Sequence, residues 1–151
     1  MAQPERNDDA AGFRAASGNA MFHHVGYAVQ SIATTGEEFA KSLGSVWNGK
    51  IIHDPLQEAK VTFIFPTAGQ APSIELLEPA SGTSPLHKFL LKGGGLHHVC
   101  FEVDCLESQL QQSRGVGCLI VKNPLPAVAF NGRKIAWIYT PQKLLVEYLE
   151  R

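Results

Sequence analysis

A seven-residue pattern of paired histidines followed by alternating apolar residues occurs twice along the chain. His-His-Val-Gly-Tyr-Ala-Val starts at His23, and His-His-Val-Cys-Phe-Glu-Val starts at His97, an offset of 97 − 23 = 74 residues. Side chains alternate between the two faces of a strand, so each copy predicts a strand with one apolar face. Such a match indicates an internal repeat when the elements that follow it also repeat.

A helical segment follows each copy of the pattern and ends at a glycine. Residues 31–43 precede Gly44, and residues 106–114 precede Gly115. Glycine just after the last periodic residue is typical of a helix C-terminus. The two copies therefore both continue from a strand into a helix.

Three strand-like runs, rich in β-branched and aromatic residues, follow each helix in the same order. Together with the first strand they give the order βαβββ in each half of the chain. We therefore predict an α+β fold of two βαβββ modules, at about 22–79 and 96–151. The six runs are 46–53, 61–65 and 74–77 in the first module and 117–122, 135–139 and 146–149 in the second.

The segment between the modules predicts a short linker helix over about 84–92. Ser84 is suited to the N-cap and Pro85 to the first helical position, and the three glycines at 93–95 then release the chain as a hinge. Residues 1–20 offer little apolar surface to bury, so we expect a flexible N-terminal tail. The rest, 21–151, is expected to form a single domain.

Composition and charge narrow the range of partners. The 151 residues are 44% hydrophobic and 18% charged, which fits one packed core. A net charge of −1 argues against nucleic acid, and no run approaches the ~18 apolar residues of a membrane span. Cys100, Cys105 and Cys118 lack the two-residue spacing of a zinc or redox pair. We expect reduced thiols, a cytoplasmic location and a small-molecule substrate.

Four metal-competent side chains fall on the strand face that points away from the predicted helices. They are His24 and Glu75 in the first module and His98 and Glu147 in the second. Packing the two module sheets around a pseudo-twofold axis would bring the four together, which predicts a metal site between the sheets. Two imidazoles and two carboxylates suit one divalent ion, namely zinc, cobalt, nickel or manganese.

The remaining histidines are not expected to bind metal. His23 and His97 alternate with the predicted ligands along their strands, so we predict that they face the helices and have structural roles. His53 and His87 have no equivalent in the other module and are predicted to lie on the surface.

These motifs together resemble the vicinal oxygen chelate superfamily, also called the glyoxalase and bleomycin resistance superfamily. Within it, the chain is most similar to the methylmalonyl-CoA epimerase family. The resemblance covers residues 22–149 and implies the fold of two βαβββ modules. Besides the two histidine motifs, the residues that carry it are Ile74-Glu75-Leu76-Leu77-Glu78-Pro79, Ser84-Pro85, Lys88-Phe89-Leu90 and Gly95-Leu96-His97-His98-Val99.

The resemblance implies that the family's metal ligands correspond to the same four residues, and that Glu75 or Glu147 also acts as the catalytic base. One position departs from the family pattern. Epimerases commonly carry a Glu, followed by Gln and Gly, in the loop before the third strand, and that Glu is a candidate acid/base residue. Here Leu56 occupies its position, and Glu58 is the nearby carboxylate that could replace it.

The expected function is that of a divalent-metal-dependent isomerase. It would remove a proton next to a thioester carbonyl and return it, through a metal-stabilised enolate. Arg133 and Lys134 are weak candidates for contacts with the phosphates of an acyl-CoA substrate. A glyoxalase-like lyase and a non-catalytic small-molecule binding protein of the bleomycin-resistance type are the alternatives. The family also implies a homodimer.

Overall fold

The two modules form the predicted repeat of elements. The computed structural model describes residues 19–65 and 73–151, so the predicted tail, 1–20, lies almost entirely outside the described residues. The first module contains β1 (Met21–Ala28), α1 (Ile32–Ser42), β2 (Ile52–Asp54), β3 (Ala59–Ile64) and β4 (Ser73–Pro79). After α2 (Leu86–Leu91), the second contains β5 (Gly95–Val103), α3 (Leu106–Gly115), β6 (Leu119–Pro126), a 3-10 helix (Val128–Phe130), β7 (Lys134–Tyr139) and β8 (Leu145–Glu150).

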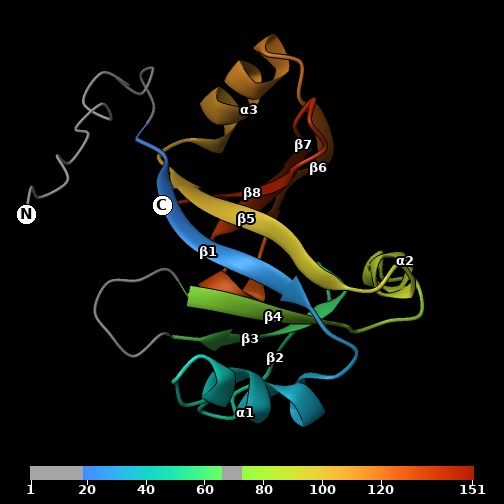
Figure 1. Cartoon of the computed structure of the whole chain (residues 1–151). Coiled ribbons are helices and arrows are strands. Elements are labelled where there is room, and N and C mark those ends of the chain that lie inside the picture. The colour runs from blue at the N-terminus through green and yellow to red at the C-terminus, as the bar shows by residue number, and fades with distance from the viewer. Residues whose placement is uncertain (1–18, 66–72) are drawn as a thin grey trace, which may run out of the picture.

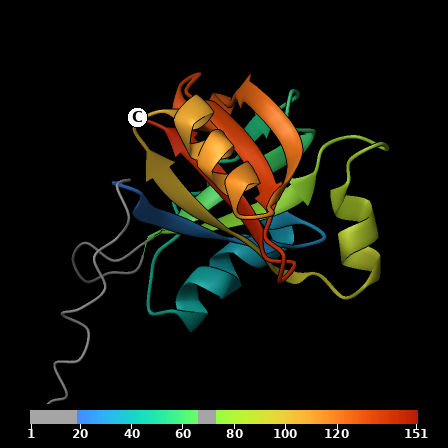
Figure 2. The ribbon, with the colours of Figure 1, turned by 90° about the horizontal axis from the view of Figure 1, so that it is seen from above.

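One continuous mixed sheet, curled into a half-barrel, runs through both modules in the order β2-β3-β4-β1-β5-β8-β7-β6. The modules meet edge to edge where β1 pairs antiparallel with β5, side by side at the middle of Figure 1. The site predicted between two sheets therefore lies on the concave face of a single sheet. Figure 2 shows the curl of the sheet and the two module helices outside it.

The helices α1 and α3 cover the convex face of the sheet. In the first module, Ile32 and Ala40 of α1 pack against Ile64 and Leu76. In the second module, Leu106 and Leu110 of α3 form the matching cluster with four strand residues, Val103, Ala136, Ile138 and Val146. These clusters explain why the apolar positions alternate with the site residues along each strand.

Each module helix is capped by a glutamate from the last strand of its own module. The backbone N–H of Ile32 donates to Glu78 Oε2 at 2.8 Å, and that of Leu106 donates to Glu150 Oε2 at the same distance. Neither helix has a side-chain cap from its own N-cap residue. The two carboxylates satisfy N–H groups that a helix terminus leaves unpaired and complement the helix dipole.

The first module departs from prediction at the run 46–53, of which only the last residues join a strand. Trp47 donates from Nε1 to Thr62 Oγ1 at 2.8 Å, and Thr62 donates in turn to the carbonyl of Lys50 at 2.6 Å. Gly49 has a φ of 73°, a conformation unsuited to a strand. The segment therefore reaches the sheet edge as an irregular loop, and β2 is short.

The linker helix begins one residue later than predicted, with Pro85 rather than Ser84 at the N-cap and Leu86 as the first helical residue. Gly93, Gly94 and Gly95 all have positive φ values, of 115°, 69° and 94°, so they form a turn that needs glycine between α2 and β5. Within residues 19–65 and 73–151, no helix has the length and apolar character needed to cross a membrane.

Candidate metal centre and adjoining cavity

Four buried side chains meet on the concave face where β1 runs beside β5. The Nε2 atoms of His24 and His98 are 3.1 Å apart. Glu75 Oε2 is 3.3 Å from His24 Nε2 and 3.5 Å from His98 Nε2. Glu147 Oε2 is 3.3 and 3.1 Å from the same two nitrogens. The structure thus brings together all four residues that the repeat pattern selected.

Strand pairing places these side chains in equivalent positions of the two modules. Gly26 pairs with Glu75 in the parallel ladder of β1 and β4, and Cys100 pairs with Glu147 in that of β5 and β8. Gly26 must lack a side chain, because a Cβ there would lie 2.0 Å from the ring of His98. The glycine in the first histidine motif therefore makes room for the histidine of the second.

Electrostatics inside this cluster favour a positive charge. Burial lowers the pKa of His24, but the carboxylates of Glu75 and Glu147 outweigh burial and raise the pKa to about 10. Burial raises the pKa of Glu147, but the imidazoles of His24 and His98 outweigh it and lower the pKa to about 2. Without a metal ion, His24 is therefore protonated at neutral pH and Glu147 is ionised.

The donor set and its spacing fit one divalent ion. At the metal–ligand distances of about 2.0 to 2.2 Å usual for His and carboxylate, two ligands of one ion lie roughly 2.8 to 3.6 Å apart. The distances between the imidazole nitrogens and the carboxylate oxygens, 3.1 to 3.5 Å, fall in that range. Among the described residues, Glu147 Oε2 is buried without a hydrogen-bond partner. Such an oxygen is expected at a cation-binding site.

The predicted orientation of His23 and His97 is wrong, because a bulge in each strand turns them toward the candidate ligands His24 and His98. Phe22 and His24 pair with the consecutive residues Phe101 and Cys100, so His23 is an extra residue on β1. His97 is likewise extra on β5, between Leu96 and His98, which pair with Tyr27 and Gly26. A bulge places consecutive side chains on one face of the sheet. Strict alternation therefore fails at both positions.

Both of these histidines contact the neighbouring ligand directly. His23 Nδ1 is 2.8 Å from His24 Nδ1, and His97 Nδ1 is 3.0 Å from His98 Nδ1. Burial, with the adjacent imidazole, lowers the pKa of His23, and the same causes lower that of His97 to about 4. Both rings are therefore neutral at pH 7. His53 and His87 are exposed, as predicted.

A cavity of about 290 Å³ opens beside His97. Its walls are mostly apolar, and the ring of Trp137 contacts both His97 and His98. Leu77 and Leu145 lie two positions from Glu75 and Glu147, which puts the cavity next to the metal centre. The remaining apolar walls are formed mainly by Leu86, Phe89, Val121 and Tyr139.

Three lysines that the sequence analysis did not select line this cavity. Lys88 and Lys92 come from α2, and Lys122 comes from β6. Lys122 donates to the carbonyl of Leu56 at 3.0 Å and to Gln57 Oε1 at 3.1 Å, so it connects the second module to a loop of the first. Lys88 belongs to a motif of the family resemblance, but only the fold brings the linker helix and β6 to the same cavity.

The two cations that the sequence did select lie elsewhere. Arg133 donates to Glu102 Oε1 and to the carbonyl of Glu150, both at 2.7 Å. Lys134 is exposed at the start of β7. Neither residue lines the cavity. Arg133 instead lies near His23, whose pKa it helps to lower.

Glu58 is also placed away from the centre. Its carboxylate accepts hydrogen bonds from Ser81, at 2.8 Å, and from Thr83, and these bonds lower its pKa. Its φ of 54° is a conformation that glycine prefers, which fits the family pattern of Glu, Gln and Gly at residues 56–58. This φ fits an alignment that puts Leu56 at the acid/base position of that pattern, while the Glu58 carboxylate is hydrogen-bonded to Ser81 and Thr83.

Fold and site together define a duplicated βαβββ protein with a candidate divalent-metal centre on its concave face. Residues 23–137 match the family described as the Glyoxalase/Bleomycin resistance protein/Dioxygenase superfamily. The chain belongs to this family, which is the superfamily that the sequence motifs resemble.

The chain is similar to an uncharacterized bacterial protein and to proteins named as acyl-CoA epimerases. The chain is 36% identical over 131 residues to the uncharacterized protein YqjC of Bacillus subtilis, covering 84% of this chain and 89% of that protein. It is 27% identical over 121 residues to the ethylmalonyl-CoA/methylmalonyl-CoA epimerase of Cereibacter sphaeroides, covering 78% and 86% of the two chains. The fold matches that of methylmalonyl-CoA epimerase from Mycobacterium tuberculosis with a TM-score of 0.76, at 24% identity over 93% of this chain and 94% of that one.

Proposed function

We propose that this chain is a divalent-metal-dependent enzyme that moves the α-proton of an acyl-CoA thioester, in the manner of an epimerase. The observation that carries the proposal is the position of the four buried candidate ligands beside an apolar cavity lined by lysines. Zinc, cobalt, nickel and manganese all suit the donor set. Homology to acyl-CoA epimerases supports the substrate class.

The cavity provides contacts for both parts of such a substrate. Its apolar walls and its volume of about 290 Å³ suit a small branched acyl group. Lys88, Lys92 and Lys122 offer three positive charges for the phosphates of CoA. Trp137 lines the cavity and contacts His98, so it gives the acyl group an apolar surface beside the candidate metal centre.

Proton transfer needs charge stabilisation and a base. A bound divalent cation would stabilise the negative charge that develops on the carbonyl oxygen as the α-proton leaves. Glu75 and Glu147 each present a buried carboxylate oxygen to the same point, and we propose one of them as the base. Inversion also needs a donor on the opposite face of the α-carbon, and Leu56 cannot supply one.

The decisive experiment separates proton exchange from inversion. The metal-loaded protein is incubated in deuterium oxide with one epimer of methylmalonyl-CoA, and deuterium incorporation and loss of chirality are measured together. We expect deuterium at the α-carbon faster than inversion, and no exchange after treatment with a chelator. Leu56→Glu should raise the rate of inversion relative to exchange.

Two outcomes would change this picture. Brisk inversion by the unaltered protein would support epimerase activity but contradict the effect expected of Leu56, and would make another residue, Glu58 first among the candidates, the second proton donor. No exchange with any acyl-CoA in the metal-loaded form would favour a glyoxalase-like lyase, whose chemistry uses the same ligands, or a binding protein without catalysis.

A homodimer stays a prediction. The edge strands are β2 and β6, and β6 exposes Leu119 and Val121. Exposed apolar edge strands are often covered by a partner. Light scattering after size-exclusion chromatography would decide the oligomeric state.

A further inference from the structure

The two histidines that precede the ligands form matching pairs with them. Ring centroids of His23 and His24 are 5.1 Å apart with an interplanar angle of 75°, and those of His97 and His98 are 5.2 Å apart at 85°. In both pairs it is the Nδ1 atoms that meet, at 2.8 and 3.0 Å. The same arrangement has thus been built twice, by bulges on two different strands.

Coordination chemistry determines the direction of these two hydrogen bonds. His24 and His98 turn their Nε2 atoms toward the carboxylates and toward each other, so Nε2 is the nitrogen available to an ion. A neutral imidazole that binds metal through Nε2 keeps its proton on Nδ1. That Nδ1–H must donate to the preceding histidine, which in turn must carry its own proton on Nε2.

We propose that His23 and His97 are positioning residues that hold His24 and His98 in the metal-binding tautomer. Metal-bound histidines generally donate their second N–H to an acceptor, and this orients the ring and raises its affinity for the ion. Here the acceptor is the preceding imidazole in each module. The inference rests on the proposed metal site, and it does not depend on which substrate the protein uses.

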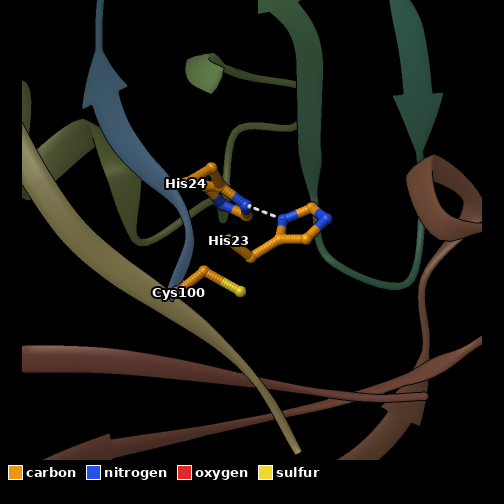
Figure 3. Close-up of side chains that lie close together, drawn as sticks. All are labelled: His23, His24 and Cys100. Atoms are coloured by element: carbon orange, nitrogen blue, oxygen red, sulfur yellow. Dashed lines mark hydrogen bonds between the residues drawn. The ribbon is translucent and has the colours of Figure 1, made fainter. Parts of the chain in front are cut away.

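Cys100 offers a competing explanation for one of the two pairs. Its thiol lies close enough to His23 and His24 to form a three-residue metal-binding group, drawn in Figure 3 with the bond between the two histidines. The repeat argues against this explanation. Residue 100 − 74 = 26 is a glycine, so the pair His97–His98 forms without any thiol beside it. A role shared by both pairs therefore cannot require Cys100.

The first test reads the tautomers directly in the unaltered protein. Histidine side chains labelled with nitrogen-15 are observed by NMR after loading with zinc, and assigned with single His→Gln variants. We expect protons on Nδ1 of His24 and His98 and on Nε2 of His23 and His97. A proton on Nδ1 of His23 or His97 would overturn the proposal for that module.

The second test measures cobalt(II) affinity by competition with a chelator, together with the visible absorption of the bound ion. His23→Leu and His97→Leu remove the acceptor and should each weaken binding about 10- to 100-fold. His23→Asn and His97→Asn offer an amide oxygen near the position of Nδ1 and should recover most of the loss. His53→Leu, an exposed histidine outside the cluster, is the matched control and should bind like the parent.

The possible failures of this test are distinct from those of the proposed function. Leu variants that bind within twofold of the parent, or Asn variants as weak as the Leu variants, would overturn the positioning role while leaving the metal site in place. A second equivalent of cadmium that disappears in Cys100→Ala would make His23 a ligand and overturn its half of the proposal. No cobalt binding by the parent would overturn both the proposed metal site and this inference, whereas a lack of proton exchange would overturn neither.

Discussion

The two ends of the candidate metal centre have the same inner residues but different surroundings. At the His23 end, the ring of Phe130 packs against His23 and His24, and the Arg133–Glu102 ion pair lies nearby. At the His97 end, the corresponding space is an open cavity beside Trp137. A duplicated sequence thus forms a nearly symmetric candidate metal centre, and the elements around it leave an open cavity on one side only.

The asymmetry comes from the connections outside the repeated strands. The 3-10 helix at Val128–Phe130 follows β6 and brings Phe130 over the first histidine pair. The linker helix α2 lies at the His97 end. There Leu86 and Phe89 form one wall of the cavity and do not fill it. Substrate selection is therefore expected to depend on α2 and β6, and metal binding on the shared strands.

The largest expected effect is a loss of metal affinity when His24 or His98, one inner histidine at each end, is replaced. His24→Ala and His98→Ala each remove one imidazole from the candidate centre, and we expect metal affinity to fall more than about 100-fold in both variants, with loss of proton exchange. Affinity is measured by competition with a chelator. A large loss in one variant and none in the other would show that the centre is not symmetric.

Removing the Phe130 ring, which fills the His23 end, should lower the free energy of unfolding. Phe130 is 9% exposed and contacts three aromatic rings, so Phe130→Ala should cost about 3 kcal/mol of unfolding free energy, or roughly 10 °C in Tm. Leu145→Ala, at the wall of the open cavity, is the control and should cost about 1 kcal/mol or less, because its side chain already faces open space. Equal losses in the two variants would contradict the contrast between the ends.

Substitutions should change the affinity for substrate only at the His97 end, where the cavity opens. Lys122→Ala removes a cavity lysine, and we expect KM for an acyl-CoA to rise about tenfold, as for the loss of one charged contact of about 1.4 kcal/mol. Lys134→Ala removes a cation outside the cavity and should leave KM unchanged. A larger rise in KM for Lys134→Ala than for Lys122→Ala in steady-state kinetics would place the CoA moiety outside this cavity.

The stability of the metal-free protein should also depend on pH, and a bound metal ion should remove that dependence. In the chelator-treated protein the pKa of His24 is about 10, above its ordinary value of 6.5. The folded state then holds more protons than the unfolded state between these values, so its stability is full below pH 6.5 and falls as the pH rises toward 10. The slope should be at most about 1.4 kcal/mol per pH unit.

This slope is measured by urea unfolding at a series of pH values. A bound divalent ion replaces the Nε2 proton of His24, so the metal-loaded protein should lack the decline between pH 7 and 10. His24→Gln has no titrating ring and should also lack it. A decline that persists in this variant would assign the effect to another group.

Some of the structure follows from local pattern alone. The period-2 strands, the glycine-ended helices and the offset of 74 residues predict the two modules and the four site residues, because equivalent positions of a repeat occupy equivalent places in the fold. The turn at Gly93–Gly95 is equally local, since its positive φ values need glycine.

Other features depend on contacts between segments far apart in the sequence. Glu78 and Glu150 cap the module helices across more than forty residues, and nothing near Ser31 or Cys105 indicates such a cap. The bulges at His23 and His97 arise only when β1 pairs with β5, so alternation assigned both histidines to the wrong face.

The identity of the metal-competent residues was thus determined by the sequence, because a side chain carries its donor atoms wherever the chain places it. The tertiary structure decided which groups support them and where a substrate can enter. Phe130 fills one end while Lys88, Lys92 and Lys122 line the other, although these residues come from three separate elements. Their relative positions depend on how the sheet curls and where the connections cross it, which no local pattern of residues encodes.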